Sequence, residues 1–190
     1  MSIAEQATLT LDEFLELPET KPASEFWNGQ TRQKPMPMTK HSAIQGGMTV
    51  KMTLAAEAKK PRLGRALPEL RCTFAGRSVV PDIAYVRRER LPIESDGRLA
   101  DRFLAAPDIT VEIVSPEQSL FELVEKVGWC VQNGVQLGWL IDPDDQEILE
   151  FAPGAPPRRL PQDGALDGRD VLPGFRCSVA EVFSWLREQS

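Results

Sequence analysis

Histidine and cysteine are scarce in this sequence, and their scarcity disfavours several kinds of active site. The 190-residue chain contains a single histidine, which argues against a Ser-His-Asp hydrolase triad. Its three cysteines, Cys72, Cys130 and Cys177, are widely spaced and form no CxxC pair, so neither a disulfide framework nor a thiolate zinc site is expected. No glycine-rich phosphate loop is visible. This cysteine usage predicts a reducing compartment, the cytoplasm.

Long apolar runs are also missing. No run reaches the roughly 20 residues that a membrane span needs, and residues 1–6 lack the basic and then apolar pattern of a signal peptide. With 42% hydrophobic and 26% charged residues, the composition is that of an ordinary globular protein. The length and the lack of internal repeats predict a single domain over residues 1–190 with a sizeable core.

Positive charge is in short supply, because the net charge is −6. Proteins that bind nucleic acid usually present a basic face, since their phosphate contacts release counterions. An acidic average lowers the expected strength of non-specific DNA binding, although it allows a local basic patch. Two clusters could touch phosphates, although a solvated surface is the commoner role: Lys59, Lys60, Arg62 and Arg65, and then Arg87, Arg88 and Arg90.

Capping signals, turn signals and apolar periodicity predict the order of helices and strands. Thr10 and Glu13 form a capping box that begins a short amphipathic helix, and Pro18 ends it. Asn28-Gly29 indicates a type I′ turn in a hairpin over residues 26–31. The other expected elements are a helix over 41–59, strands over 70–74, 79–86, 109–114, 137–143 and 148–151, helices over 118–133 and 179–187, and irregular connections over 87–106 and 153–170.

Three residues in these elements suggest a metal site. Asp82 lies within one expected strand, Glu112 interrupts a second, otherwise apolar strand, and Lys126 lies on the helix that follows. Paired strands could bring the two carboxylates within a few ångströms, where they repel each other unless a cation neutralises them. Hard oxygen ligands of this kind suit Mg²⁺ or Mn²⁺. A neighbouring ammonium group could orient water and stabilise developing negative charge.

Each of these residues also has a purely structural interpretation. Glu112 could be a core carboxylate paired with Lys126 or an arginine, since charged residues are rarely buried without a partner. Asp82 alone is typical of a turn or a strand end, and Lys126 alone of a solvated helix face. Asp108 repeats the Pro-Asp pair, but it lies four residues from Glu112 on one strand, about 13 Å away, which is too far to share an ion.

A wider set of segments resembles one known family. The segments are 80–86, 106–116, 125–127, 133–135 and 139–143, with weaker matches at 9–17, 25–29, His41 and 172–175. In their order and spacing they are similar to the Uma family, a bacterial family described as restriction endonucleases of the PD-(D/E)XK superfamily. The resemblance covers almost the whole chain. It implies an α/β fold with a restriction-endonuclease-like core, in which helices flank a central mixed β-sheet, preceded by an N-terminal helix and hairpin.

The resemblance also implies roles for individual residues. It makes Asp82 and Glu112 ligands of Mg²⁺ or Mn²⁺. The superfamily lysine usually stands two residues after the glutamate, where this chain has valine, and the family pattern carries it over to Lys126. Glu25 is implied as a further catalytic residue that adds a ligand or orients water. His41 is implied either as a phosphate contact or as the cap of its helix.

These residues lead to three functional hypotheses. The resemblance implies a metal-dependent endonuclease that hydrolyses DNA phosphodiester bonds, acts as a homodimer and needs no membrane. The acidic charge and the relocated lysine suggest a non-catalytic nucleic-acid- or protein-binding module on the same fold. A hydrolase of another phosphorylated substrate would tolerate the net charge of −6 more easily than a nuclease of duplex DNA would. The fold alone does not separate them, because function depends on the site.

Overall fold

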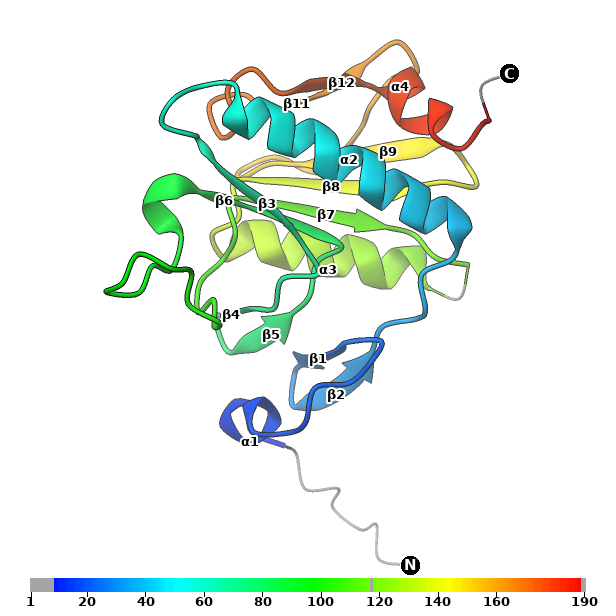
Figure 1. Cartoon of the computed structure of the whole chain (residues 1–190). Helices are drawn as coiled ribbons and strands as arrows, with labels where there is room; N and C mark the ends of the chain where they lie inside the picture. Colours follow the sequence, from blue (N-terminus) through cyan, green and yellow to red (C-terminus); the bar gives the residue numbers. More distant parts are fainter. Residues whose placement is uncertain (1–8, 117, 189–190) are drawn as a thin grey trace, which may run out of the picture.

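The computed structural model describes residues 9–116 and 118–188, and Figure 1 shows how their helices and strands are arranged. Residues 1–6, considered above for a signal peptide, lie outside the described residues. Within the described ranges, no helix is both long enough and apolar enough to cross a lipid bilayer.

A six-stranded mixed sheet forms the centre of the molecule, in the order β10-β9-β8-β7-β6-β3. β7 (Ile109–Ile113) and β8 (Leu137–Asp142) run parallel, and the other neighbours pair antiparallel. A parallel pair needs a crossover connection, which α3 (Leu120–Gln132) supplies. The remaining strands of this sheet are β3 (Gly64–Pro68), β6 (Ile83–Arg87), β9 (Glu147–Phe151) and β10 (Arg158–Arg159).

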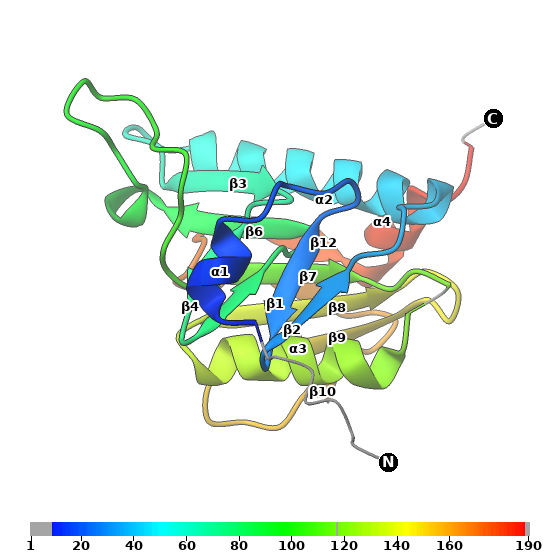
Figure 2. The same ribbon diagram turned by 90° about the horizontal axis from the view of Figure 1, so that it is seen from below.

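Helices cover both faces of this sheet. α2 (Thr39–Glu57) and α4 (Val179–Ser184) lie on one face and α3 on the other, with the strands between them (Figure 2). Successive side chains of a strand point to opposite faces. The apolar side chains of Ile109, Val111 and Ile113 therefore pack in the core beneath α2, whereas Glu112 points toward α3.

A smaller sheet, in the order β2-β1-β5-β4, lies below the main sheet in Figure 1. Its first hairpin turns at Asn28 and Gly29, whose φ angles of 51° and 77° are both positive, as a type I′ turn requires. The Thr10–Glu13 capping box is present and begins a short helix beside this sheet. The elements are α1 (Leu11–Leu15), β1 (Ser24–Trp27), β2 (Gln30–Gln33), β4 (Cys72–Phe74) and β5 (Arg77–Val79).

The structure departs from the predicted elements in four places. The strand predicted over 79–86 is divided between β5 and β6, which belong to different sheets. Pro81 lies at the division, because it has no N–H to donate to either ladder. β3 was not predicted. The connection predicted over 153–170 contains β10 and also β11 (Ala165–Asp167), which pairs with β12 (Arg176–Ser178), while the connection over 87–106 opens with the short helix η1 (Arg88–Arg90).

Candidate active site

The start of β6 and the end of β7 bring two carboxylates together. The antiparallel register pairs Ile83 with Val111, so one step further along the strands Asp82 falls opposite Glu112. The backbone N–H of Ile113 donates a hydrogen bond of 2.7 Å to Asp82 Oδ2. Asp82 and Glu112 are each only 1% exposed. Two acidic groups thus lie side by side in the interior, where each needs a positive partner.

Asp82 has two cationic or polar side chains against it. Lys34 Nζ donates to Asp82 Oδ1 at 2.6 Å and to the Val80 carbonyl at 2.8 Å. His41 Nε2 lies 3.0 Å from Asp82 Oδ2. Burial alone would raise the pKa of Asp82, but the Lys34 charge and the His41 contact outweigh burial and hold that pKa well below its usual range. Asp82 is therefore ionised across the physiological pH range.

Glu112 shares one lysine with a second glutamate. Lys126 Nζ lies 2.7 Å from Glu112 Oε1 and 2.7 Å from Glu25 Oε1, and Glu25 Oε1 also accepts a hydrogen bond of 2.6 Å from the Val80 N–H. Glu112 Oε1 is within ion-pair distance of the ammonium but receives no well-directed hydrogen bond from the described residues. Burial raises the pKa of Glu112 to about 7, against the opposing effect of Lys126. Burial by itself would lower the pKa of Lys126, but Glu112 and Glu25 raise it above its ordinary value.

Separate elements position these groups. Glu25 is on β1 and Lys34 follows β2, so the hairpin delivers one acid and one base. His41 is in the first turn of α2, whose N-cap is Met38 and which has no side-chain cap. Gln45, one helical turn later, donates to the Asp82 carbonyl at 2.9 Å. The first turn of α2 and the hairpin thus converge on one aspartate.

The charges of the cluster suit a divalent cation only in part. When all of them are ionised, the three carboxylates and two ammonium groups together carry one net negative charge. Two carboxylates with free water positions are a normal Mg²⁺ environment, because this ion keeps several waters and takes few protein ligands. No group of three His, Cys, Asp or Glu side chains among the described residues is arranged to hold a metal. Asp82 and Glu112 are the two residues that could hold such an ion, and Lys34 would have to leave Asp82 first.

A surface cleft of about 300 Å³ reaches this cluster. Its walls are the β1–β2 hairpin and the first turns of α3, and it exposes parts of Glu25, Lys34 and Lys126. The side chains of Lys34 and Lys126 are only 9% and 8% exposed, respectively. The charged lining consists of three basic and three acidic side chains: Arg32, Lys34 and Lys126, and Glu25, Glu122 and Glu125. The two ammonium groups could donate to a phosphate or another anion in the cleft.

The structure brings all five predicted residues, Glu25, His41, Asp82, Glu112 and Lys126, into this one cluster. Lys34 was not predicted. Asp108, the second Pro-Asp aspartate, lies at the opposite end of β7 and accepts hydrogen bonds from the Arg87 N–H and Arg90 Nη1 at 2.8 and 2.7 Å. Its role is to hold the connection after β6, far from the cleft.

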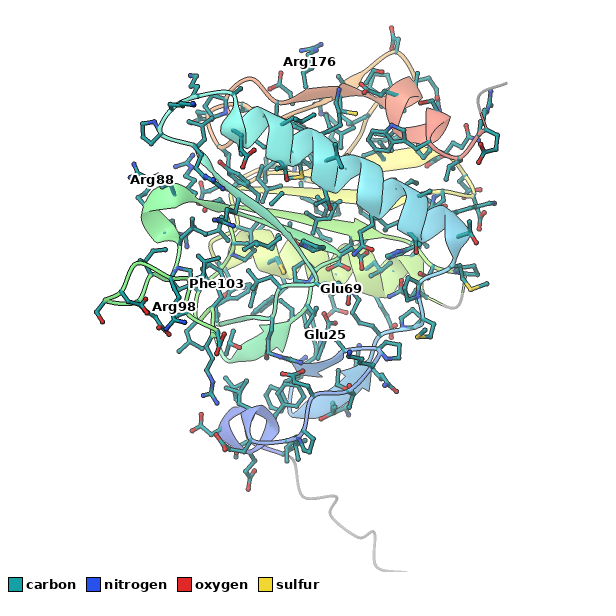
Figure 3. The ribbon with its side chains drawn as sticks, viewed as in Figure 1. Glu25, Glu69, Arg88, Arg98, Phe103 and Arg176 are labelled. Carbon is teal, nitrogen blue, oxygen red and sulfur yellow. The ribbon has the colours of Figure 1, made fainter. Side chains whose placement is uncertain are left out.

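The two basic clusters of the sequence come together in space. β3 pairs with β6, which places Arg62 and Arg65 beside Arg88 around a surface depression that Arg98 also lines. In Figure 3 Arg88 and Arg98 lie on the side of the molecule away from Glu25. Five residues of β6 separate Asp82 from the arginines at its far end, or about 17 Å of strand. This basic surface is therefore separate from the cleft.

The mixed sheet with helices on both faces has the architecture of the restriction-endonuclease-like class, whose members generally use divalent metals. A sequence profile of the Uma2 family, described as "Putative restriction endonuclease", matches residues 11–180. The chain belongs to the Uma2 family. It is similar to a solved structure described as "a putative nuclease belonging to DUF820" from Anabaena variabilis, with a TM-score of 0.90 and 42% identity over 94% of this chain and 99% of that chain. No curated protein was found to match it.

Proposed function

We propose that this protein is a metal-dependent endonuclease that hydrolyses DNA phosphodiester bonds in the cleft between the β1–β2 hairpin and α3. The observation that carries the proposal is the convergence of Asp82, Glu112 and Lys126 at the end of two paired strands. The family description and the description of the Anabaena variabilis relative support nuclease chemistry. The two lysines of the cleft support an anionic substrate.

Each side chain has a role in this proposal. Asp82 and Glu112 would hold Mg²⁺ or Mn²⁺, which polarises a phosphoryl oxygen and lowers the pKa of a bound water. Lys126 stabilises the negative charge that develops on the phosphate, and Glu25 keeps its ammonium in place. His41 lies against Asp82 and not toward the cleft, so we assign it the positioning of that aspartate.

The cleavage of supercoiled and single-stranded DNA with Mn²⁺ tests the proposal. Asp82→Asn and Glu112→Gln should each lower the cleavage rate by about a thousandfold or more, the scale expected when a central electrostatic group is lost. Asp108→Asn is the matched control. Like Asp82, Asp108 is a buried aspartate next to a strand of the main sheet and has a basic partner, which in its case is Arg90. The control should retain cleavage. Equal activity in Asp82→Asn and Asp108→Asn would contradict the proposed site.

A non-catalytic binding module is the second candidate. The lysines already pair with the buried carboxylates, and within the described residues no group of three His, Cys, Asp or Glu side chains is arranged to hold a metal. Such a module would bind nucleic acid or protein without Mn²⁺, so calorimetry separates the candidates. Mn²⁺ binding that is lost in Glu112→Gln favours the nuclease, and no Mn²⁺ binding favours the module. Metal binding without DNA cleavage would redirect the search to other phosphoesters.

We also propose a homodimer in the cytoplasm. Cutting both strands of a duplex takes two hydrolytic sites, which two copies of the chain provide. The three cysteines are unpaired and buried, which is compatible with a reducing compartment. Light scattering of the purified protein measures the assembly directly, and a mass of one chain across micromolar concentrations would rule out a stable dimer.

A further inference from the structure

Lys34 lies where the proposed metal site needs an open carboxylate oxygen. Its ammonium is 2.6 Å from Asp82 Oδ1, and its side chain is 9% exposed. A divalent cation on the same oxygen would lie within a few ångströms of the ammonium, and like charges at that distance repel strongly in a buried site. Asp82 therefore cannot easily serve both partners at once.

We propose that Lys34 is a second catalytic lysine, which occupies Asp82 in the metal-free protein and transfers its ammonium to the scissile phosphate when Asp82 takes up the metal. The proposal rests on the proposed function. It assigns Lys34 two successive partners, an aspartate of the chain and a phosphate oxygen of the substrate, and no bond other than hydrogen bonds changes in the transfer.

Among the partners of Asp82, Lys34 is the one that can move. The Ile113 N–H belongs to a central strand, and His41 is fixed on the 19-residue helix α2. Lys34 follows the hairpin and precedes an irregular stretch of backbone. Its ammonium is carried on a flexible stem of four carbons. Its backbone N–H is tied to the Ala23 carbonyl at 2.9 Å, so the side chain can swing while the backbone stays in place.

The cleft gives the ammonium a place to go. Lys34 and Lys126 both line it, so one phosphate group could contact both. An ammonium has three donors, and Lys34 uses two of them, toward Asp82 Oδ1 and the Val80 carbonyl, within the described residues. Loss of the Asp82 contact would leave two donors for phosphate oxygens. Charge supports the same exchange, because a divalent metal and a phosphodiester together add one positive charge, which offsets the one net negative charge of the ionised cluster.

Calorimetry with Mn²⁺ alone tests the first step without any cleavage assay. Lys34→Met should bind Mn²⁺ about tenfold more tightly than the wild type, because Asp82 no longer has to release an ammonium. Lys40→Met is the control for simple loss of positive charge, since Lys40 is also 2.6 Å from an aspartate, Asp144, but is exposed. It should stay within about twofold of the wild type, as expected for an exposed, solvent-screened charge. Lys34→Gln, which retains a neutral donor, is the second variant should Lys34→Met fold poorly.

DNA cleavage at saturating Mn²⁺ tests the second step. Lys34→Met should lower kcat by about a hundredfold, the loss typical of one donor to a transition-state oxyanion, while Lys34→Arg recovers part of it. Unchanged Mn²⁺ affinity in Lys34→Met, or no Mn²⁺ binding by any form, would overturn the exchange at Asp82. Tighter Mn²⁺ binding with undiminished kcat would overturn the phosphate contact. If the wild type binds Mn²⁺ but cuts no DNA, the nuclease proposal fails while the calorimetric comparison still decides whether Lys34 and the metal compete.

Discussion

Glu112 is a carboxyl group set in the middle of an apolar strand. Its neighbours along β7, Val111 and Ile113, are fully buried, and Glu112 is 1% exposed. Burial raises its pKa to about 7, and the nearby Asp82 charge adds to that effect. The protein thus keeps a carboxyl group that is half protonated near neutrality, although Lys126 lies 2.7 Å away.

Folding stability should therefore depend on the protonation of Glu112. The unfolded carboxyl has a pKa near 4.5 and the folded one near 7, so the folded state retains the proton longer. The raised pKa of Glu112 adds roughly 3 kcal/mol to the free energy of unfolding. This stabilisation is fully present below pH 4.5 and is lost as the pH rises through 7. Urea unfolding of the metal-free protein at pH 5 and pH 8 should show Glu112→Gln gaining stability relative to the wild type at the higher pH. A constant difference between the two would refute the raised pKa.

The site residues differ in how readily the sequence reveals them. Glu112 stands out because a carboxylate interrupts an apolar strand, and Asp82 because it follows a proline within an expected strand. Lys34 gives no such signal, since it lies in a stretch without periodicity and its partner is 48 positions along the chain. That contact depends on the path of the hairpin across the sheet edge, which local sequence patterns do not determine.

Among the contacts between elements, those of Arg77 link the β1–β2 hairpin to α3. Its guanidinium lies over the rings of Trp27 and Trp129, 3.6 and 4.4 Å from their centroids, and Phe74 stacks on Trp129 from another strand. Arg77 Nη2 also donates to Asn28 Oδ1 at 2.6 Å. Trp27 is two residues from Glu25 and Trp129 three from Lys126. The stack therefore maintains the spacing across which those two side chains meet.

Removal of Arg77 should weaken the contact between the β1–β2 hairpin and α3. Arg77→Ala is expected to lower the free energy of unfolding by about 1–2 kcal/mol, because its half-buried guanidinium contacts two rings and lies between the exposed and desolvated cases of a cation–π contact. Hydrogen exchange should speed up in the hairpin over residues 24–33. Arg158→Ala is the comparison, because Arg158 pairs with Glu150 on β9, away from the hairpin, and its loss should leave hairpin exchange unchanged. Identical exchange patterns in the two variants would show that Arg77 has no special role in that contact.

Local sequence signals predict those helices and turns that nearby residues determine. They do not predict a strand that forms only because it pairs with a distant strand. The capping box, the Asn28-Gly29 turn and the apolar helix α3 all follow from nearby residues. β3, with the sequence Gly64-Arg65-Ala66-Leu67-Pro68, has no β-branched residue and no alternation. It becomes a strand because it pairs with β6 along its whole length and packs against α2. Such strands depend on long-range contacts and escape a local analysis.

In the molecule as a whole, the N-termini of two helices, α2 and α3, lie at the same end of the main sheet. α2 begins beside Asp82 and α3 begins at the cleft, where Ser119 caps its first turn, and both helices start on the same side in Figure 1. Partial positive charge at helix N-termini favours anions nearby. The helix N-termini thus add partial positive charge at an end of the sheet where the ionised side chains of the cluster together carry one net negative charge.

Metal binding should stabilise the entire fold. At a Mn²⁺ concentration of 100 times Kd, a ligand that binds only the folded state adds about 2.7 kcal/mol, or very roughly 5–10 °C in Tm for a chain of this size. Chelation should reverse the gain, and Asp82→Asn should abolish it. Calorimetric melting of both proteins with and without Mn²⁺ measures the effect. An equal rise in Asp82→Asn would place the stabilising metal elsewhere.

The order of the site residues along the chain also controls when the site can exist. Glu25 comes from the first hairpin and Lys126 from the middle of α3, and β7 between them needs β8 as its parallel neighbour. A ribosome must therefore synthesise the chain beyond residue 142 before the cluster can assemble. Until then the carboxylates and lysines of the cluster stay separated in the nascent chain. Any cutting activity would appear only after these strands of the sheet have formed. The topology thus delays assembly of the cluster until most of the chain has been synthesised.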